Sequence, residues 1–449
     1  MGSTTPHPSA VLDVQATDKA FYPPRLTTIQ RKAIVNPQSG AFVYDLDKST
    51  FYLFDGVKWL PLAFTTDSNL PTTDRTASDG AAGDQFGFSV AISGDYALVG
   101  SPRNDVGANI NQGAVYVFVR SGSTWTQQTK LTVFGGSAGD QFGFSVAISG
   151  NSLLIGSPYD DVGSNIDQGS AYVFVRSGSV WSQLPVLTAS DGAGNDAFGE
   201  SVAISSNDAL VGSNRAIGYR GAAYVFVRPG STWIQQAKLI AGDGAVNDRF
   251  GGSVAISGNY ALVGCYGDDV GSNADQGSAY VFVRSGSSWP QQAKLIANDG
   301  AANDRFGVSV AISGDYALIS SPYDNIGDVS GDQGSAYVFV RIGGGWSQQT
   351  KLIANDPANY DNFGITVAIS GDYALVGSPY HDVGGNKDQG SAYLYKREGT
   401  SWLFVRQITD NSPANTRNSA SGISNGTFII GGGGVQNFQG KVGFGTVDN

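Results

Sequence analysis

The chain has 449 residues, a net charge of −11 and 62 glycines, and only 14% of its residues are charged. This composition is typical of turn-rich β-structure and argues against a long-helical or disordered protein. The acidic excess, without a basic stripe, argues against binding to nucleic acid. No apolar run reaches the ~18 residues of a membrane span, so we expect no membrane insertion. The single cysteine, Cys265, excludes an intrachain disulfide.

The N-terminal region lacks the repeats that follow it. The first residues, Met1-Gly2-Ser3, do not form a signal peptide, so an export signal would have been removed. The sequence at Thr27–Ile34 predicts a short helix capped by a threonine. Ala41–Phe54 predicts a hairpin that turns at Asp47-Lys48 and packs outside the last blade.

A Phe-Gly pair then recurs at intervals of 52–57 residues. The pairs begin at Phe86, Phe142, Phe198, Phe250, Phe306 and Phe363. Each pair leads into four short segments that alternate apolar and polar residues between glycine-rich turns, which is the pattern of β-strands. In the first repeat the expected strands are Ser89–Ser93, Tyr96–Gly100, Ala114–Arg120 and Trp125–Leu131. The small side chains of the first segment suit the crowded position near a propeller axis.

The seven tryptophans indicate the number of blades. Six of them open the fourth strand of a repeat, whereas Trp59 precedes the first Phe-Gly pair. The C-terminal region supplies three strands of a seventh repeat, at Ser419–Ile423, Thr427–Gly431 and Lys441–Val447. We therefore predict an all-β, seven-bladed β-propeller of four-stranded blades, in which Trp59–Phe64 closes the ring as the missing outer strand. The expected domains are an N-terminal extension or linker (1–40), a hairpin with the closing strand (41–74) and the propeller (75–449).

The connections between the expected strands are unequal. Those after the second and fourth strands are long and acidic, and those after the first and third are tight turns. The turn after the third strand follows an arginine, as at Arg120, Arg176, Arg228, Arg284 and Arg341. Antiparallel geometry places both long connections on one face, which we expect to be acidic and to carry any binding site. The opposite face is expected to be basic.

Two of the acidic loops are candidate calcium sites. The candidate ligands are Asp160, Asp161, Asn165 and Asp167 in the second repeat and Asp268, Asp269, Asn273 and Asp275 in the fourth. Calcium binds six to eight oxygen ligands of these types. The alternative is turn chemistry, because Asp and Asn also hydrogen-bond their own backbone. Calcium is the only cofactor expected.

The third repeat departs from the others, because its long loop is four residues short and has lost its acids. This loop has gained Arg215, Tyr219 and Arg220, and Arg249 lies in the next loop of the same face. Arg and Tyr are favoured at binding hot spots, and guanidinium groups pair with carboxylates and sulfates. We predict that these four residues bind a ligand. The alternative is a harmless deletion in a degenerate repeat.

No catalytic constellation is visible in the sequence. The two histidines are His7, in the N-terminal tail, and His381, which replaces an aspartate of the sibling loops. Cys265 occupies the place of a small residue and is expected to be a buried filler. A glycosidase needs two carboxylates that act as a pair, but the acids here repeat from blade to blade. We therefore expect no enzyme, with a carbohydrate-active hydrolase as the alternative.

Phe86-Gly87 followed by Gly100-Ser101-Pro102 resembles the FG-GAP repeat of integrin α-subunit head propellers and many bacterial surface proteins. The resemblance covers residues 75–449 and departs at Gly212-Ser213-Asn214 and Gly264-Cys265-Tyr266. The calcium position of integrins is not carried over, because the corresponding connection here is only a tight turn.

A second resemblance concerns the N-terminal region. Ala10–Val14, Pro23–Arg31 and Phe42–Asp45 resemble a segment found ahead of surface and tail-fibre-like domains in Bacteroidetes. Together, the two resemblances imply a secreted or surface-displayed bacterial adhesion module that recognises a protein or glycan through the face that carries its long loops. They also imply attachment to a larger surface or fibre assembly through the N-terminal segment. A purely structural tip or adaptor is the alternative.

Overall fold

The computed structural model describes residues 24–39, 41–46, 50–54, 57–61, 74–327, 331–409, 418–432 and 440–447. The chain divides into two compact units, an N-terminal unit (Met1–Ser68) and a propeller (Asn69–Asn449). Within these described ranges, no helix combines the length and apolar character needed to span a bilayer.

The N-terminal unit contains one sheet and one short helix. Its elements are β1 (Arg25–Leu26), α1 (Thr28–Lys32), β2 (Phe42–Asp45), β3 (Thr50–Phe54) and β4 (Trp59–Pro61). The predicted capped helix is confirmed, because the Thr27 hydroxyl accepts a hydrogen bond from the Gln30 N–H at 3.2 Å. A buried ion pair of 2.7 Å between Arg31 and Asp45 ties α1 to β2. The predicted hairpin is also confirmed as the antiparallel pair β2–β3, although its turn at residues 47–49 lies outside the described residues.

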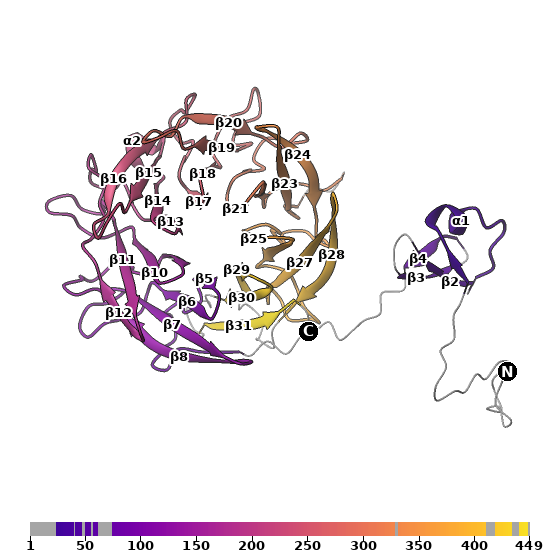
Figure 1. Cartoon of the computed structure of the whole chain (residues 1–449), viewed down its shortest axis with the longest axis horizontal. Helices are drawn as coiled ribbons and strands as arrows, with labels where there is room; N and C mark the ends of the chain where they lie inside the picture. The colour runs from indigo at the N-terminus through magenta and orange to yellow at the C-terminus, as the bar shows by residue number, and fades with distance from the viewer. Residues whose placement is uncertain are drawn as a thin grey trace. The chain divides into compact units, whose positions relative to one another are not determined.

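The propeller consists of antiparallel sheets in which strand order follows chain order from the inside outward (Figure 1). Blade one comprises β5 (Ser89–Ser93), β6 (Tyr96–Ser101), β7 (Ala114–Ser121) and β8 (Thr124–Leu131). Blade two comprises β9 (Ser145–Ser149), β10 (Ser152–Ser157), β11 (Ser170–Ser177) and β12 (Val180–Gln183). Blade three comprises β13 (Ser201–Ser205), β14 (Asp208–Ser213), β15 (Ala222–Val227) and β16 (Ile234–Leu239), with the short helix α2 (Ala216–Tyr219) between β14 and β15.

Blade four comprises β17 (Ser253–Ser257), β18 (Tyr260–Cys265), β19 (Ser278–Val283) and β20 (Gln291–Leu295). Blade five comprises β21 (Val310–Ser313), β22 (Tyr316–Ser321), β23 (Ser335–Ile342) and β24 (Gly345–Leu352). Blade six comprises β25 (Thr366–Ser370), β26 (Tyr373–Ser378), β27 (Ser391–Glu398) and β28 (Ser401–Ile408). The last sheet, blade seven, comprises β29 (Asn418–Ser424), β30 (Thr427–Gly432) and β31 (Lys441–Thr446).

The described part of the propeller thus holds six four-stranded sheets and one three-stranded sheet. Their innermost strands contact one another in chain order, and β29 contacts both β25 and β5, so the ring closes. The strands predicted in the first repeat and at the C-terminal end agree with the observed strands to within one residue.

The predicted closing strand is not confirmed. Trp59–Pro61 is β4, which pairs with β3 in the N-terminal unit, and residues 62–64 lie outside the described residues. A partner a few residues away in the chain costs less loop-closure entropy than one at the other end of it, which favours the local hairpin. At the outer edge of β31, Arg75 and Val442 exchange two backbone hydrogen bonds, of 2.8 and 3.0 Å. The segment just before the first Phe-Gly pair therefore joins blade seven to blade one.

The recurring motif holds neighbouring blades together. Phe250 is fully buried and makes edge-to-face contacts with Tyr280 and Phe282 of its own blade, at centroid distances of 5.6 and 5.9 Å. A Cβ placed on Gly156 of β10 would lie 1.9 Å from the carbonyl oxygen of Gly199 in the next blade. The Phe-Gly pair of one repeat and the Gly-Ser pair of the preceding repeat are therefore two halves of one backbone contact.

Candidate ligand-binding face

The two kinds of long connection interlock between adjacent blades. Between blades one and two, the N–H groups of Gly139 and Phe142 donate to the carbonyl oxygens of Ile110 and Gln112, at 2.9 and 2.8 Å. An equivalent bond joins the Phe306 N–H to the Gln276 carbonyl between blades four and five. The face built by these loops, such as residues 102–113 and 132–144, is called the long-loop face below. Its loops are held by main-chain bonds, so the face offers a rigid platform.

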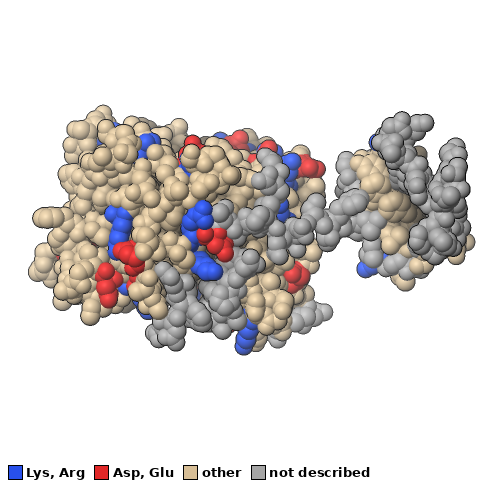
Figure 2. Space-filling view, turned by 90° about the horizontal axis from the view of Figure 1, so that it is seen from below, with Lys and Arg blue, Asp and Glu red and all other residues tan. Residues whose placement is uncertain are grey.

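Ion pairs at both ends of the blades partly offset the expected difference in charge between the two faces. At the turn end of blade one, Arg120 lies 2.8 Å from Asp95, and at the loop end Lys130 lies 2.6 Å from Asp79. Figure 2 shows basic and acidic side chains side by side on the flank of the propeller. Opposite charges are paired near both ends of the blades, which reduces the field of either face.

A repeated polar cluster lies beneath the long loops. In blade five, Lys351 bridges Asp299 and Asp324 at 2.7 and 2.6 Å, and the Tyr337 hydroxyl donates to Asp299 at 2.9 Å. Burial opposes ionisation of Asp299, but the hydrogen bonds from Lys351 and Tyr337 outweigh it and lower the pKa of that carboxyl. Lys130, Lys238 and Lys294 pair with the equivalent aspartates of blades one, three and four. Most of the repeating acids therefore anchor loops.

The calcium candidates all make hydrogen bonds or ion pairs within their own loops or blades. The Asp161 carboxylate accepts from the backbone N–H of Asp167 at 2.9 Å, and Asp269 accepts likewise from Asp275 at 2.9 Å. Of the other four, Asp160 accepts from the Tyr172 hydroxyl at 2.7 Å, Asp268 pairs with Lys294 at 2.7 Å, and Asn165 and Asn273 donate to Gln168 and Gln276 at 2.7 and 2.8 Å.

These contacts support the turn interpretation, since Asp167 and Asp275 also have positive φ angles of 52° and 49°. Among the residues that the structure describes, no three His, Cys, Asp or Glu side chains are arranged to hold a metal ion. Calcium binding stays a prediction, and its test is given below.

The four residues predicted to bind ligand lie in and beside the loop of blade three, and each has a contact within the protein. The Arg215 guanidinium donates to the Tyr159 hydroxyl of blade two at 3.2 Å, whereas Arg220 donates to the Gly244 carbonyl at 2.6 Å. Tyr219 and Arg249 do come together, with the guanidinium carbon 4.4 Å from the ring centroid. The structure therefore pairs Tyr219 with Arg249, and ligand binding by the four residues stays a prediction.

Sequence reasoning missed Glu200, which lies 4.0 Å from Arg215 and accepts a hydrogen bond from Asn214 at 2.9 Å. Burial raises the pKa of this carboxyl, although the Arg215 charge opposes the shift. Its signal was available, because the other repeats place apolar residues or glycine directly after Phe-Gly. These are Phe88, Phe144, Gly252, Val308 and Ile365.

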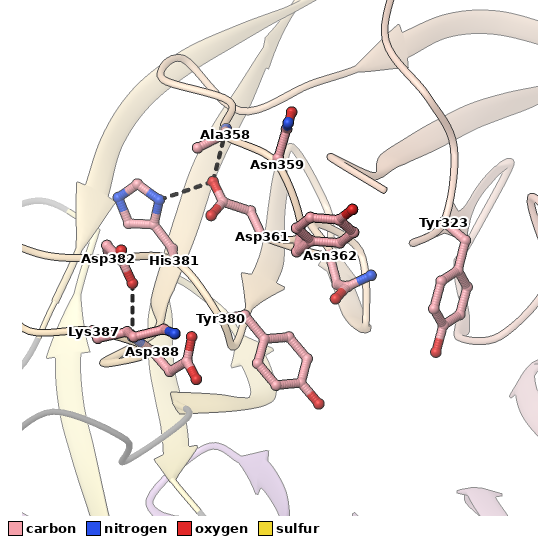
Figure 3. Close-up of a pocket in the computed structure, with 11 residues that line it drawn as sticks. Tyr323, Ala358, Asn359, Asp361, Asn362, Tyr380, His381, Asp382, Lys387 and Asp388 are labelled. Carbon is pink, nitrogen blue, oxygen red and sulfur yellow. Dashed lines mark hydrogen bonds and ion pairs between the residues drawn. The ribbon is translucent and has the colours of Figure 1, made fainter. Parts of the chain in front are cut away.

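A hollow of ligand size lies on the long-loop face at blade six (Figure 3). This blade-six cavity has a volume of about 500 Å³ and is lined by Tyr323, Ala358, Asn359, Tyr360, Asp361, Asn362, Tyr380, His381, Asp382, Lys387 and Asp388. The loop before β25 and the loop between β26 and β27 supply most of the lining, and Tyr323 comes from blade five. Small-molecule sites commonly have volumes of about 300–1,000 Å³.

His381 forms part of the cavity wall. Its Nδ1 lies 3.0 Å from Asp361 and its Nε2 lies 3.4 Å from Asp356. Burial would lower the pKa of His381, but the hydrogen bond and charge of Asp361, with the charge of Asp356, raise it. His381 is therefore held within blade six by two carboxylates. Cys265 is buried, as predicted, and its thiol donates to the Asp248 carbonyl at 3.3 Å.

The ring of blades and its interlocked loops define a β-propeller with a single elaborated face. Six stretches of the chain match the FG-GAP repeat, at residues 75–118, 125–174, 181–226, 233–282, 289–339 and 346–395. The chain belongs to the FG-GAP repeat family, as its Phe-Gly spacing predicts. Residues 1–76 match the phage tail like trimerisation region, in agreement with the tail-fibre-like resemblance of the N-terminal segment. No curated protein sequence matches the chain.

Proposed function

We propose that this protein is the receptor-binding head of an extracellular, trimeric, tail-like assembly, and that the propeller binds a protein or glycan on a cell surface. The observation that carries the proposal is the combination of two parts in one chain. A region similar to phage tail trimerisation regions precedes a propeller of FG-GAP repeats, a family often found in extracellular binding and adhesion.

The long-loop face is the proposed contact surface. Its loops are fixed to one another by main-chain hydrogen bonds, so little conformational entropy is lost when a partner docks. Trimerisation would present three such faces together. Linked sites can raise overall avidity by about 10²–10⁴ over one site, so a weak individual contact suffices for a stable attachment.

We further propose that the propeller binds without turnover. The acids on its long-loop face are mostly paired with lysines or with backbone N–H groups, as Asp299 and Asp161 are. Such carboxylates hold loops in place and are not poised to act on a substrate. A hydrolase would release products from a bound polysaccharide, and chromatography of the supernatant detects them.

The test uses the full chain. Analytical ultracentrifugation should give a trimer, and the fluorescently labelled protein should bind the surface of at least one class of intact cell in a panel of bacterial and mammalian cells. Protein that is monomeric and adheres to none of these cells would contradict the proposal. Release of soluble saccharide from the bound cells would favour the hydrolase alternative.

A further inference from the structure

We propose that the blade-six cavity is a binding site for neutral saccharides, with pyranose rings stacked on its tyrosines. This inference rests on the proposed function and gives it a ligand class and a place. It concerns a different blade from the arginine-containing loop of blade three.

Tyr360 is the first reason. It has a φ of 67° in the loop before β25, at a place where five other repeats have glycine or asparagine. Those residues are Gly83, Gly139, Asn195, Asn247 and Asn303, and all have positive φ angles. A left-handed backbone costs about 1–2 kcal/mol for a residue with a Cβ. Glycine does not bear this cost, and Asn and Asp can reduce it through local hydrogen bonds. Tyr360 is 65% exposed, so packing against the protein does not offset that strain. Strained residues of this kind cluster at ligand sites.

Two further tyrosines extend the aromatic surface. Tyr323 and Tyr380 occupy the same place in consecutive blades, two residues after the end of β22 and of β26. Figure 3 shows both rings projecting from their loops, with the Asn362 amide between them. The faces of aromatic rings carry partial negative charge and attract the polarised C–H bonds of a pyranose. Tyrosine also offers a large contact area at little conformational cost.

The polar groups of the wall are already oriented. Asn359 accepts a hydrogen bond from Gln333 at 2.8 Å, and the Asn362 amide donates to the Pro322 carbonyl at 3.0 Å. The Asp382 carboxylate accepts from the backbone N–H of Asp388 at 2.8 Å. A few fixed amide and carboxylate groups among aromatic rings are what recognition of sugar hydroxyls requires.

The charges of the lining favour a neutral ligand. Asp361, Asp382 and Asp388 lie in the wall, against Lys387 and His381, and the Arg305 guanidinium carbon lies 5.0 Å from the Tyr323 ring centroid. The imidazole of His381 faces Asp361 and Asp356, so its positive charge is taken up by these carboxylates. Sialylated and sulfated glycans would therefore meet a wall without an excess of positive charge to pair with them, whereas a neutral glycan needs none.

The experiment uses the full chain on a glycan array that carries neutral, sialylated and sulfated glycans. The strongest neutral glycan is then titrated by biolayer interferometry against Tyr360→Asn and Tyr380→Ala. The matched control is Phe134→Ser, because Phe134 is an exposed aromatic (98%) in the corresponding loop of blade two and lies outside the cavity lining. Both tyrosine variants should weaken binding at least about tenfold, which corresponds to about 1.4 kcal/mol. Phe134→Ser should bind as the unchanged protein does.

Thermal melting separates loss of the site from loss of the fold. Tyr360→Asn installs the residue that three sibling loops carry, so its Tm should be equal or higher. The proposal is overturned if no neutral glycan binds, if only anionic glycans bind, or if both tyrosine variants bind as before. Cell adhesion that survives in both tyrosine variants would overturn this site and leave the proposed function standing. A full chain that binds neither cells nor glycans would overturn both.

Discussion

The polar cluster of blade five shows which residues can replace those of the equivalent cluster in blade six. In blade five, Lys351 bridges Asp299 and Asp324 at 2.7 and 2.6 Å. Blade six has Gln407 at the place of the lysine and His381 at the place of Asp324, so its positive charge sits in the loop and not on the outer strand. The variant His381→Asp removes that charge, and the double variant His381→Asp/Gln407→Lys restores it at the blade-five position.

The single variant should be strongly destabilised. The new carboxylate would face Asp361, now 3.0 Å from the imidazole, and Asp356 at 3.4 Å. Like charges about 4 Å apart at an effective dielectric constant of about 20 repel by about 4 kcal/mol. Protonating an ordinary carboxyl at about pH 7 also costs about 4 kcal/mol, which limits the penalty. We expect a loss of about 2–4 kcal/mol in unfolding free energy, mostly from Asp361, because Asp356 is 45% exposed and screened by water.

Urea unfolding at about pH 7 and about pH 5 is the assay, because protonation at the lower pH should shrink the penalty. The double variant should recover most of the loss, with a coupling energy of about 1–3 kcal/mol between the two positions. The unchanged protein should also be more stable at the lower pH, but through its imidazole and not through a protonated carboxyl. Its raised His381 pKa contributes stability that is complete below about 6.5 and is lost as the pH rises through the folded-state pKa. A single variant as stable as the unchanged protein, or a double variant no better than the single, would refute the assigned cluster.

Three other predictions follow from the same structure. Removing residues 1–68 should leave the Tm of the propeller unchanged in calorimetry, because the described blade strands all come from residues 69–449. The same truncation should abolish the trimer in ultracentrifugation. A lower Tm would support the closing strand predicted at Trp59. Asp161→Ala should lower stability by about 1 kcal/mol through loss of its bond to Asp167. If the acidic loops hold calcium, millimolar calcium should raise the Tm of the unchanged protein, and an unchanged Tm would leave the turn interpretation standing. Burial raises the pKa of Asp140 to about 6, so stability should fall as the pH rises from about 4 to 6. Asp140→Asn should stabilise the protein at about pH 7 and have little effect at about pH 4 in thermal melts, and an equal effect at both would contradict the shift.

Much of the fold could be predicted because strand signals in this chain are local. Alternation in Tyr116–Arg120 between glycine turns is enough to place β7, and its repetition places the same strand in every blade. The closing strand could not be predicted in this way. Trp59 sits in a segment that resembles the fourth strand of a blade, but its ring contacts Phe54 of β3 at a centroid distance of 5.4 Å. The residue pattern around Trp59 is the same whether its strand pairs with β3 or with blade seven, so only the tertiary structure distinguishes the two pairings.

The candidate site was harder to predict, because its chemistry depends on pairs of residues that are far apart in the chain. Asp79 looks like a turn residue in the sequence, yet it holds Lys130 at 2.6 Å, 51 residues later. The repeats do contain a trace of this pairing. Blade two has Gly135 in place of the aspartate and Val186 in place of the lysine, so both partners are lost together. Comparing the repeats column by column in pairs would have identified the cluster before the structure did.

The same comparison separates two kinds of exception among the blades. His381 is an exception with a compensating change, because blade six has Gln407 where the other clusters have lysine. The two changes together move the positive charge from the outer strand to the loop of blade six. Tyr360 is an exception without a visible compensating change, since it keeps the left-handed backbone of its siblings and is 65% exposed. A compensated change preserves stability and says little about function. A strained residue without a compensating change is most readily retained when it contributes to ligand binding. Tyr360 is therefore stronger evidence for a binding site than any of the repeating acids.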